Sequence, residues 1–190
     1  MNELDEEIFD EENKNDYVVV QMFTPDECDA IIKHCNKHYN LRDAGVSSPE
    51  GKPRGNMRPN VRNNQIAWLD NNDESTTWFR DKIKELILSV NNQKYNYDIS
   101  WAQKPQFTKY SCEEFYSWHI DMGIKHPANK RKLSTTVQLS DPKNHLGGEL
   151  MLLISGSQYH TVKLEKGQGV IFPSHVPHQV TPVESPPGSK

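Results

Sequence analysis

The second half of the chain is a succession of short strand-like segments separated by turn signals. From Tyr97 onward, seven segments carry strand-forming residues: 97–101, 105–110, 114–121, 132–140, 149–155, 158–164 and 169–173. Turn residues separate them, notably at Gly147, Gly148, Gly156 and Gly167. Many short strands with regular punctuation are typical of a sandwich or jelly roll. We therefore expect this half to fold as two facing β-layers.

The first half contains one expected strand and two expected helices. Residues 17–23 are β-branched and aromatic, which predicts a strand. Thr24 then supplies an N-cap, proline follows at the first helical position, and Glu27 completes a capping box. Apolar residues recur at helical spacing as far as Tyr39 and again over 75–91. Helices that precede all the later strands are expected to pack on the outer face of the sheet.

A long loop is expected over residues 41–64, which are rich in Gly, Pro, Asn and Arg and show no periodicity. Loops of this length in compact domains are often functional lids or disordered segments. Arg54, Arg58 and Arg62 lie in it. Ordinary surface charge is the expected role of these arginines, and contact with a substrate is the alternative.

The charge of the chain is unevenly distributed. Residues 1–16 contain eight acidic residues and one lysine, against a net charge of −4 for all 190 residues. We expect this acidic head to be solvated and mobile. The remainder is slightly basic, which suits an anionic cosubstrate but is too weak a bias to indicate a nucleic-acid partner. The length itself fits one domain.

The composition predicts a soluble protein of the cytoplasm. No apolar run approaches the roughly 20 residues that span a bilayer, so no membrane partner is expected. The N-terminus lacks the basic-then-apolar layout of a signal peptide. Cys28, Cys35 and Cys112 make an odd count without a CxxC motif, which favours reduced structural thiols. The oligomeric state is not predicted by any of these features.

His119 and Asp121 form a His-x-Asp pattern in a strand-like stretch, and His178 follows far downstream. Successive side chains of a strand point to opposite faces, so His119 and Asp121 project to the same side. A second strand carrying His178 would complete two imidazoles and one carboxylate around a metal. This 2-His-1-carboxylate set is diagnostic of non-haem Fe(II) oxygenases.

Other histidines compete for such a role. His175 lies three residues before His178 and is the second candidate for the distal ligand. His34 and His38 are one helical turn apart, which would also allow a metal site. Lysines are interleaved with that pair, so a solvated helix face is the expected role of His34 and His38.

The segment around the His-x-Asp pattern resembles the metal-binding segment of iron(II)/2-oxoglutarate-dependent dioxygenases of the prolyl 4-hydroxylase type. Tyr110 and Tyr116 stand nine and three residues before His119, as two tyrosines do in that family. Further similar stretches are Arg131–Leu139, Gly147–Leu150, Gly167–Ser174 and His178–Val183. The resemblance covers residues 17–183, and bacterial and phage PKHX-type hydroxylases are the nearest group.

This resemblance implies a reaction and a set of cofactors. The family uses Fe(II), 2-oxoglutarate and O2 to hydroxylate an unactivated C–H bond with release of succinate and CO2, and ascorbate is an optional addition. A prolyl or other peptidyl side chain is the first expectation for the substrate, with a small molecule as the alternative. His119, Asp121 and His178 are the implied metal ligands and catalytic centre. Tyr110 and Gln138 are the implied contacts of the cosubstrate.

Two aromatic residues of the same segment have implied roles at the pocket. Tyr116 and Trp118 are expected to support the metal ligands or to form the pocket wall. For Trp118, a place in the hydrophobic core is an equal alternative.

The end of the chain departs from the family pattern. In relatives, an Arg or Lys about ten residues after the distal histidine lies on a final strand and pairs with the far carboxylate of 2-oxoglutarate. Here position 188 is glycine, and residues 184–190 resemble a linker. The final strand is therefore predicted to be missing. The alternatives are a shortened chain, Lys190 as a displaced anchor, and a cosubstrate that is held by other residues or not bound at all. Glu113 stands where relatives often have a turn glycine.

The combined prediction is a double-stranded β-helix, or jelly roll, with flanking helices. An acidic head covers residues 1–16, one dioxygenase domain covers 17–183, and a tail covers 184–190. Within the domain, residues 17–96 support the sheet and residues 97–183 form the jelly roll. The leading function is a 2-oxoglutarate-dependent hydroxylase. A catalytically inactive jelly-roll module that retains the metal site is the alternative, and a metal-dependent cupin without a 2-oxoacid is a third.

Overall fold

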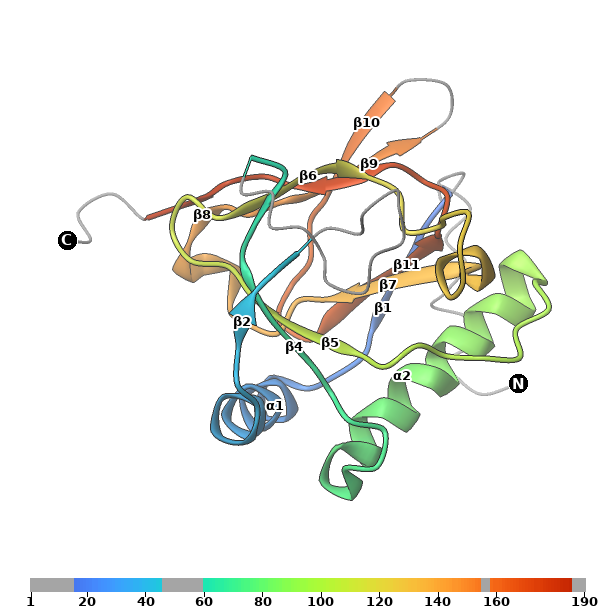
Figure 1. Cartoon of the computed structure of the whole chain (residues 1–190), viewed down its shortest axis with the longest axis horizontal. Helices are drawn as coiled ribbons and strands as arrows, with labels where there is room; N and C mark the ends of the chain where they lie inside the picture. The colour runs from blue at the N-terminus through green and yellow to red at the C-terminus, as the bar shows by residue number, and fades with distance from the viewer. Residues whose placement is uncertain (1–15, 46–59, 155–157, 186–190) are drawn as a thin grey trace.

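Two β-layers face each other in the computed structural model, and two helices cover the outside of one of them (Figure 1). The structure describes residues 16–45, 60–154 and 158–185. The acidic head up to residue 15, Arg54, Arg58 and Lys190 lie outside the described residues. Within the described part, no helix is long and apolar enough to cross a membrane.

The layer next to the helices consists of two separate three-stranded sheets. One has the order β1 (Val18–Gln21), β11 (Gln168–Pro173), β7 (Leu133–Val137), and the other has the order β2 (Arg42–Asp43), β4 (Gln65–Trp68), β5 (Gln106–Lys109). Every pairing within them is antiparallel. The predicted strands at 17–23, 105–110, 132–140 and 169–173 are thereby confirmed; the first three are shorter than predicted, and the last begins one residue earlier.

The opposite layer is a five-stranded sheet. Its order is β10 (Gln158–Val162), β9 (Leu150–Ile154), β12 (His178–Val180), β6 (Phe115–His119), β3 (Arg62–Asn63). Two short strands, β13 (Val183–Glu184) and β8 (Leu146–Gly147), form a separate pair. The predicted strands at 114–121, 149–155 and 158–164 are confirmed, and the two layers together form the jelly roll that the sequence predicted.

The two expected helices are α1 (Pro25–His38) and α2 (Thr77–Val90). The predicted capping box of α1 is present: the Glu27 amide donates to Oγ1 of Thr24 at 3.2 Å, and the Thr24 amide donates to Oε2 of Glu27 at 2.8 Å. Cys28 and Cys35 are buried on the inner face of α1, and burial raises the pKa of the Cys35 thiol to about 11. Shorter helical turns are Glu74–Thr76, Asn91–Tyr95, Ala128–Lys130 and Pro142–Asn144.

One predicted strand, 97–101, is not formed. The buried side chain of Asn91 takes both backbone groups of Tyr97, since its Nδ2 donates to the Tyr97 carbonyl at 2.9 Å and its Oδ1 accepts from the Tyr97 amide at 3.0 Å. Asn96 adopts a left-handed conformation with φ of 54°. The backbone of Tyr97 is therefore already paired with Asn91, and none of the described strands pairs with residues 97–101.

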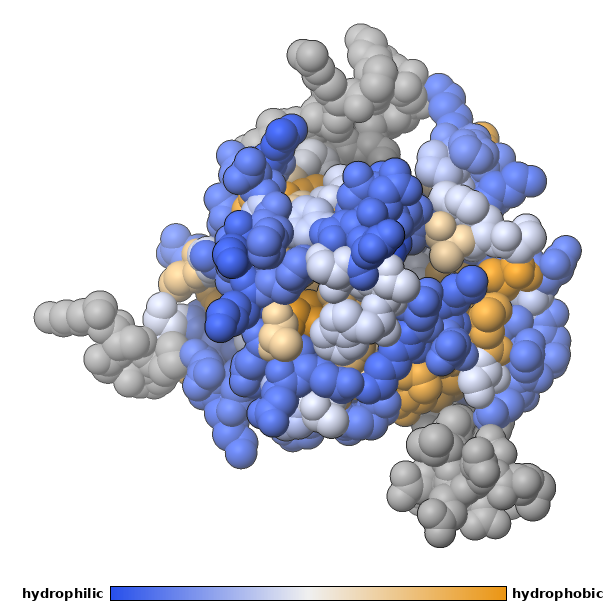
Figure 2. Space-filling model, turned by 90° about the horizontal axis from the view of Figure 1, so that it is seen from below, coloured by the Kyte–Doolittle hydropathy of each residue, from blue (hydrophilic) through white to orange (hydrophobic). Residues whose placement is uncertain are grey.

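Two hydrophobic clusters hold the layers together. The first lies between the helices and the sheet of β1, and it includes Phe23, Phe79 and Ile171. The second lies between the two layers, and it includes Leu152 and Phe172. Strand β11 contributes to both clusters, so it is buried on both faces. Seen from the side of the helices, the surface is mainly hydrophilic with limited apolar areas (Figure 2).

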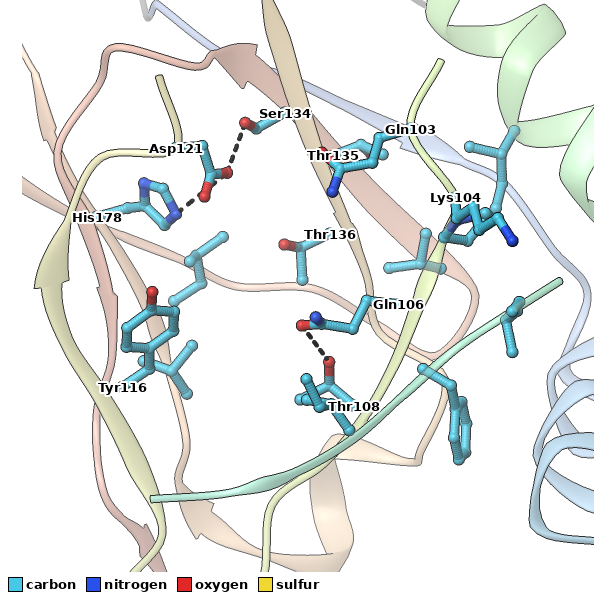
Figure 3. Close-up of a pocket in the computed structure, with 18 of the residues that line it drawn as sticks. Gln103, Lys104, Gln106, Thr108, Tyr116, Asp121, Ser134, Thr135, Thr136 and His178 are labelled. Carbon is cyan, nitrogen blue, oxygen red and sulfur yellow. Dashed lines mark hydrogen bonds and ion pairs between the residues drawn. The ribbon is translucent and has the colours of Figure 1, made fainter. Parts of the chain in front are cut away.

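The layer next to the helices is open between β5 and β7. Strand β5 pairs with β4 and β7 pairs with β11, and within the described residues no strand lies between them. Residues of both strands line a cavity of about 3050 Å³, among them Gln106 and Thr136 (Figure 3). Ligand pockets usually have about 300–1,000 Å³, so this cavity is larger than the space that one small ligand fills.

The open edge of β7 has a testable consequence for amide exchange. Gln138, one residue past β7, donates its amide to the Gln168 carbonyl at 2.9 Å. Because peptide groups alternate along a strand, the Thr136 amide also faces β11, while those of Thr135 and Val137 face the opening. We expect Thr135 and Val137 to exchange amide hydrogen much faster than Thr136, as measured by NMR. Equal protection at all three positions would mean that another strand occupies the edge.

A second prediction concerns Glu113, whose φ of +66° lies in the left-handed region. This conformation costs a residue with a Cβ about 1 kcal/mol or more, and glycine adopts it freely. Glu113→Gly should therefore raise the free energy of unfolding by about 1 kcal/mol in urea denaturation. Asn96→Gly is the control, because asparagine tolerates this region and should gain less. A loss of stability in Glu113→Gly would contradict the reasoning.

Candidate metal centre

The three residues of the His-x-Asp…His pattern meet on neighbouring strands. His119 ends β6, Asp121 follows it by two residues, and His178 begins β12. Strands β6 and β12 are antiparallel, and His178 is the direct partner of His119 in their register. One ligand atom from each of the three side chains lies within 4.8 Å of the others. Among the described residues, this is the one cluster of three or more potential metal-ligating side chains.

The atoms that face one another are those a metal would use. Nε2 of His119 lies 3.9 Å from Oδ1 of Asp121, and Nε2 of His178 lies 3.7 Å from Oδ2 of Asp121. Figure 3 shows His178 and Asp121 pointing toward each other at the cavity wall. The side chains of His119 and His178 are largely buried, while that of Asp121 is about one-third exposed. The cluster therefore lies at the inner end of an accessible cavity.

Backbone carbonyls fix the tautomer of both histidines. Nδ1 of His119 donates to the Ser117 carbonyl at 2.8 Å, and Nδ1 of His178 donates to the Val176 carbonyl at 3.0 Å. A carbonyl oxygen can only accept, so each ring carries its hydrogen on Nδ1 and presents a lone pair at Nε2. Burial, aided by the nearby His178, lowers the pKa of His119 to about 4. His119 is therefore neutral at pH 7, the form that binds metals.

Asp121 is held at its carboxylate and at its backbone carbonyl by groups that the sequence analysis missed. Oγ of Ser134 donates to Oδ2 of Asp121 at 2.6 Å and is itself 2.9 Å from Oγ of the fully buried Ser174 (Figure 3). Nη1 of Arg131 donates to the Asp121 carbonyl at 2.7 Å. The Ser134 bond occupies one carboxylate oxygen and leaves Oδ1 free. Asp121 is thus prepared to act as a ligand through a single oxygen.

These donors fit Fe(II) by their chemistry. Two neutral imidazoles and one carboxylate are the 2-His-1-carboxylate set of non-haem iron sites. All three are oriented by further hydrogen bonds, as metal ligands usually are. His175, the competing candidate for the distal ligand, lies exposed in the turn before β12 and is not part of the cluster.

A bulge in β6 brings Tyr116 to the same side as His119. The register with β12 pairs His178 with His119 and Val180 with Tyr116, so three steps along β6 match two along β12. The Tyr116 ring consequently lies flat on the His119 ring, with centroids 3.5 Å apart and planes 16° apart. The guanidinium carbon of Arg62 lies 4.4 Å from the centre of the Tyr116 ring.

Of the three predicted contacts of the cosubstrate, two line the cavity and the third is not described by the structure. Tyr110 follows β5 and lines the cavity, where burial raises the pKa of its hydroxyl to about 12. Gln138 also lines the cavity, but its side-chain amide is already engaged. Its Nε2 donates to the carbonyl and to Oγ of Ser140 at 2.9 Å and 3.1 Å. Lys190 lies outside the described residues.

Two expectations for residues near the site were wrong. Trp118 is neither pocket wall nor core, because the strand alternation places it opposite His119, where it is 38% exposed and packs against Tyr159 at 5.3 Å. Arg62 was expected as surface charge, but it lines the cavity and contacts Tyr116. Its position arises from the pairing of β3 with β6, in which Arg62 is the partner of Tyr116.

Residues 105–190 match the sequence profile of the 2OG-Fe(II) oxygenase superfamily. This match covers less than half of the chain. The chain is 34% identical over 130 residues to the PKHD-type hydroxylase YbiX of Escherichia coli, a stretch that covers 65% of this chain and 55% of YbiX. The chain thus spans about half the length of the curated relatives it matches.

Solved structures share the fold of this chain at lower sequence identity. A prolyl-4-hydroxylase of Pseudomonas putida superposes with a TM-score of 0.68 at 22% identity, over 89% of this chain and 87% of its own. A prolyl hydroxylase of Trichoplax adhaerens, in complex with a hypoxia inducible factor peptide, gives 0.68 at 16%, over 91% and 80%. The viral collagen prolyl hydroxylase of Paramecium bursaria Chlorella virus-1 gives 0.63 at 19%, over 92% of both chains.

The Ser134 bond yields a prediction about metal affinity. Ser134→Ala removes the donor that fixes the Asp121 carboxylate, and losing such a supporting group costs about 10-fold or more in metal affinity. We expect that weakening in a titration with Co(II), followed by its visible absorption. Thr136→Val is the control, since Thr136 lies on the same strand and lines the cavity without being part of the Asp121 network. Equal affinity in Ser134→Ala and the wild type would exclude this role for Ser134.

Proposed function

We propose that this protein is an Fe(II)- and 2-oxoglutarate-dependent hydroxylase of a prolyl or other peptidyl side chain. The observation that carries the proposal is the convergence of His119, Asp121 and His178, with both Nδ1 atoms bonded and both Nε2 atoms free. The match of residues 105–190 to the 2OG-Fe(II) oxygenase superfamily and the similarity to YbiX support the reaction class. The peptide in the complex of the Trichoplax relative supports a peptidyl substrate.

In this proposal, His119, Asp121 and His178 hold Fe(II). When bound, the iron supplies open positions for O2 and 2-oxoglutarate, so that oxidation of the substrate C–H bond accompanies decarboxylation of 2-oxoglutarate to succinate and CO2. The three side chains keep the donor atoms in place through their bonds to Ser117, Val176 and Ser134.

Tyr110 and Gln138 are the proposed contacts of 2-oxoglutarate. With a pKa raised to about 12, the Tyr110 hydroxyl keeps its proton at neutral pH and can donate to a carboxylate. The Gln138 amide can reach a ligand only after leaving Ser140, so we expect it to contribute less than Tyr110. Lys190 stays a prediction for the far carboxylate.

Apolar side chains exclude water from one side of the centre. The edge of the Phe172 ring faces the His178 ring, with centroids 4.9 Å apart and planes at 69°, and both residues are buried. Leu152, the strand partner of His178 in β9, has no exposed surface. A dry wall on this side strengthens the electrostatic interactions of the site and directs access to the cavity side.

The test is succinate formation from 2-oxoglutarate with Fe(II), ascorbate and a set of proline-containing peptides. We expect a peptide to stimulate succinate release by the wild type and His119→Ala to abolish it. His175→Ala is the matched control and should retain the activity, because His175 is an exposed neighbour outside the cluster. Undiminished turnover in His119→Ala would refute the assignment of the site. Metal binding by the wild type without succinate under any condition would instead support the inactive jelly-roll module.

A further inference from the structure

Three side chains form a continuous stack that ends on a proposed metal ligand. The guanidinium of Arg62 lies over one face of Tyr116, at 4.4 Å from the ring centre. The Tyr116 ring lies on His119 with centroids 3.5 Å apart and planes only 16° apart. None of the three is a chain neighbour of another, so the stack depends on the pairing of β3 with β6 and on the bulge in β6.

Arg62 is itself held in place from two sides. Its Nε donates to Oδ1 of Asn64 at 2.9 Å, and its Nη2 donates to Oε1 of Gln106 at 2.8 Å. Asn64 is buried at 2% exposure and lies between β3 and β4, while Gln106 is the first residue of β5. The guanidinium plane is therefore fixed by both β-layers, and Arg62 links them beside the metal centre.

Arg62 brings a positive charge to the cavity beside the proposed metal ligands. This charge opposes the binding of Fe(II), although it suits an anionic cosubstrate in the same cavity. A planar guanidinium stacks on an aromatic ring, which a flexible ammonium does less well. Besides its charge, Arg62 therefore contributes a contact that restrains the Tyr116 ring.

We propose that Arg62 is a positioning residue for the metal centre, which holds Tyr116 flat against His119 and so fixes the direction of the His119 Nε2 lone pair. The bond from His119 Nδ1 to Ser117 limits rotation of the imidazole at one atom, and the Tyr116 ring covers one of its faces. With both restraints present, the ring has one orientation. The proposal rests on the metal centre of the proposed function.

The test is a Co(II) titration of the full chain, followed by the visible d–d absorption, with the unfolding temperature of each metal-free variant as a check on folding. Arg62→Gln should weaken Co(II) binding about 10-fold, the effect typical of losing a group that orients a ligand, and should alter the band shape. Arg62→Lys keeps the charge but not the planar stack, so it should resemble Arg62→Gln.

Variants of Tyr116 test whether the effect passes through this ring. Tyr116→Phe keeps the ring and should bind Co(II) within about twofold of the wild type, whereas Tyr116→Leu should lose about 10-fold. In the Tyr116→Leu background, Arg62→Gln should have almost no further effect, because residues that act as one unit are not additive.

Lys104→Gln is the matched control for charge. Lys104 lines the same cavity and pairs with the exposed Asp70 at 3.3 Å, away from the stack. The substitution Lys104→Gln removes one positive charge from the cavity and should leave Co(II) affinity and band shape unchanged.

The outcomes separate this proposal from the proposed function. If the wild type binds Co(II), and Arg62→Gln and Tyr116→Leu bind it with the same affinity, the positioning role is overturned and the metal centre stands. Tighter binding in Arg62→Gln, but not in Arg62→Lys, would show that Arg62 acts only as a repelling charge and would also overturn the role. No Co(II) or Fe(II) binding by the wild type would overturn the metal centre and the positioning role together.

Discussion

The antiparallel pairing of β6 with β12 is the constraint on which the site depends. It places His178 directly opposite His119, and the bulge between His119 and Tyr116 sets which side chains face the cavity. A slip of one residue along β6 would turn His119 outward and bring Trp118 in.

The centre combines two different ways of preparing a ligand. The histidines are held by carbonyls within their own strands or turns, two residues away in each case, at Ser117 and Val176. The carboxylate of Asp121 is instead held from the opposite layer by Ser134 of β7. His178 is thus fixed by local backbone geometry, whereas Asp121, and His119 through its proposed stack with Tyr116 and Arg62, depend on how the two layers pack. Packing changes between the layers should therefore act on Asp121 and His119 before they act on His178.

The contrast also explains what could be predicted from the sequence. The period of two along a strand suffices to place His119 and Asp121 on one face, and the turn signals and helical spacing suffice for most strands and both helices. Ser134 and Arg62 carry no such signal, because they meet the site through strand pairing and layer packing across the chain. The failure at 97–101 has the same origin: composition favoured a strand, but Asn91 already satisfied the Tyr97 backbone.

The proposed metal ligands and the proposed cosubstrate contacts lie in different parts of the protein. The proposed ligands lie on β6 and β12, in the five-stranded sheet that is continuous from β10 to β3. The proposed 2-oxoglutarate contacts, Tyr110 and Gln138, follow β5 and β7, whose facing edges are open. Unpaired edges are available for pairing with other strands. The proposed metal ligands therefore lie within a continuous sheet, whereas the proposed cosubstrate contacts flank the opening between β5 and β7, so a segment that pairs with these edges would act first on the cosubstrate contacts.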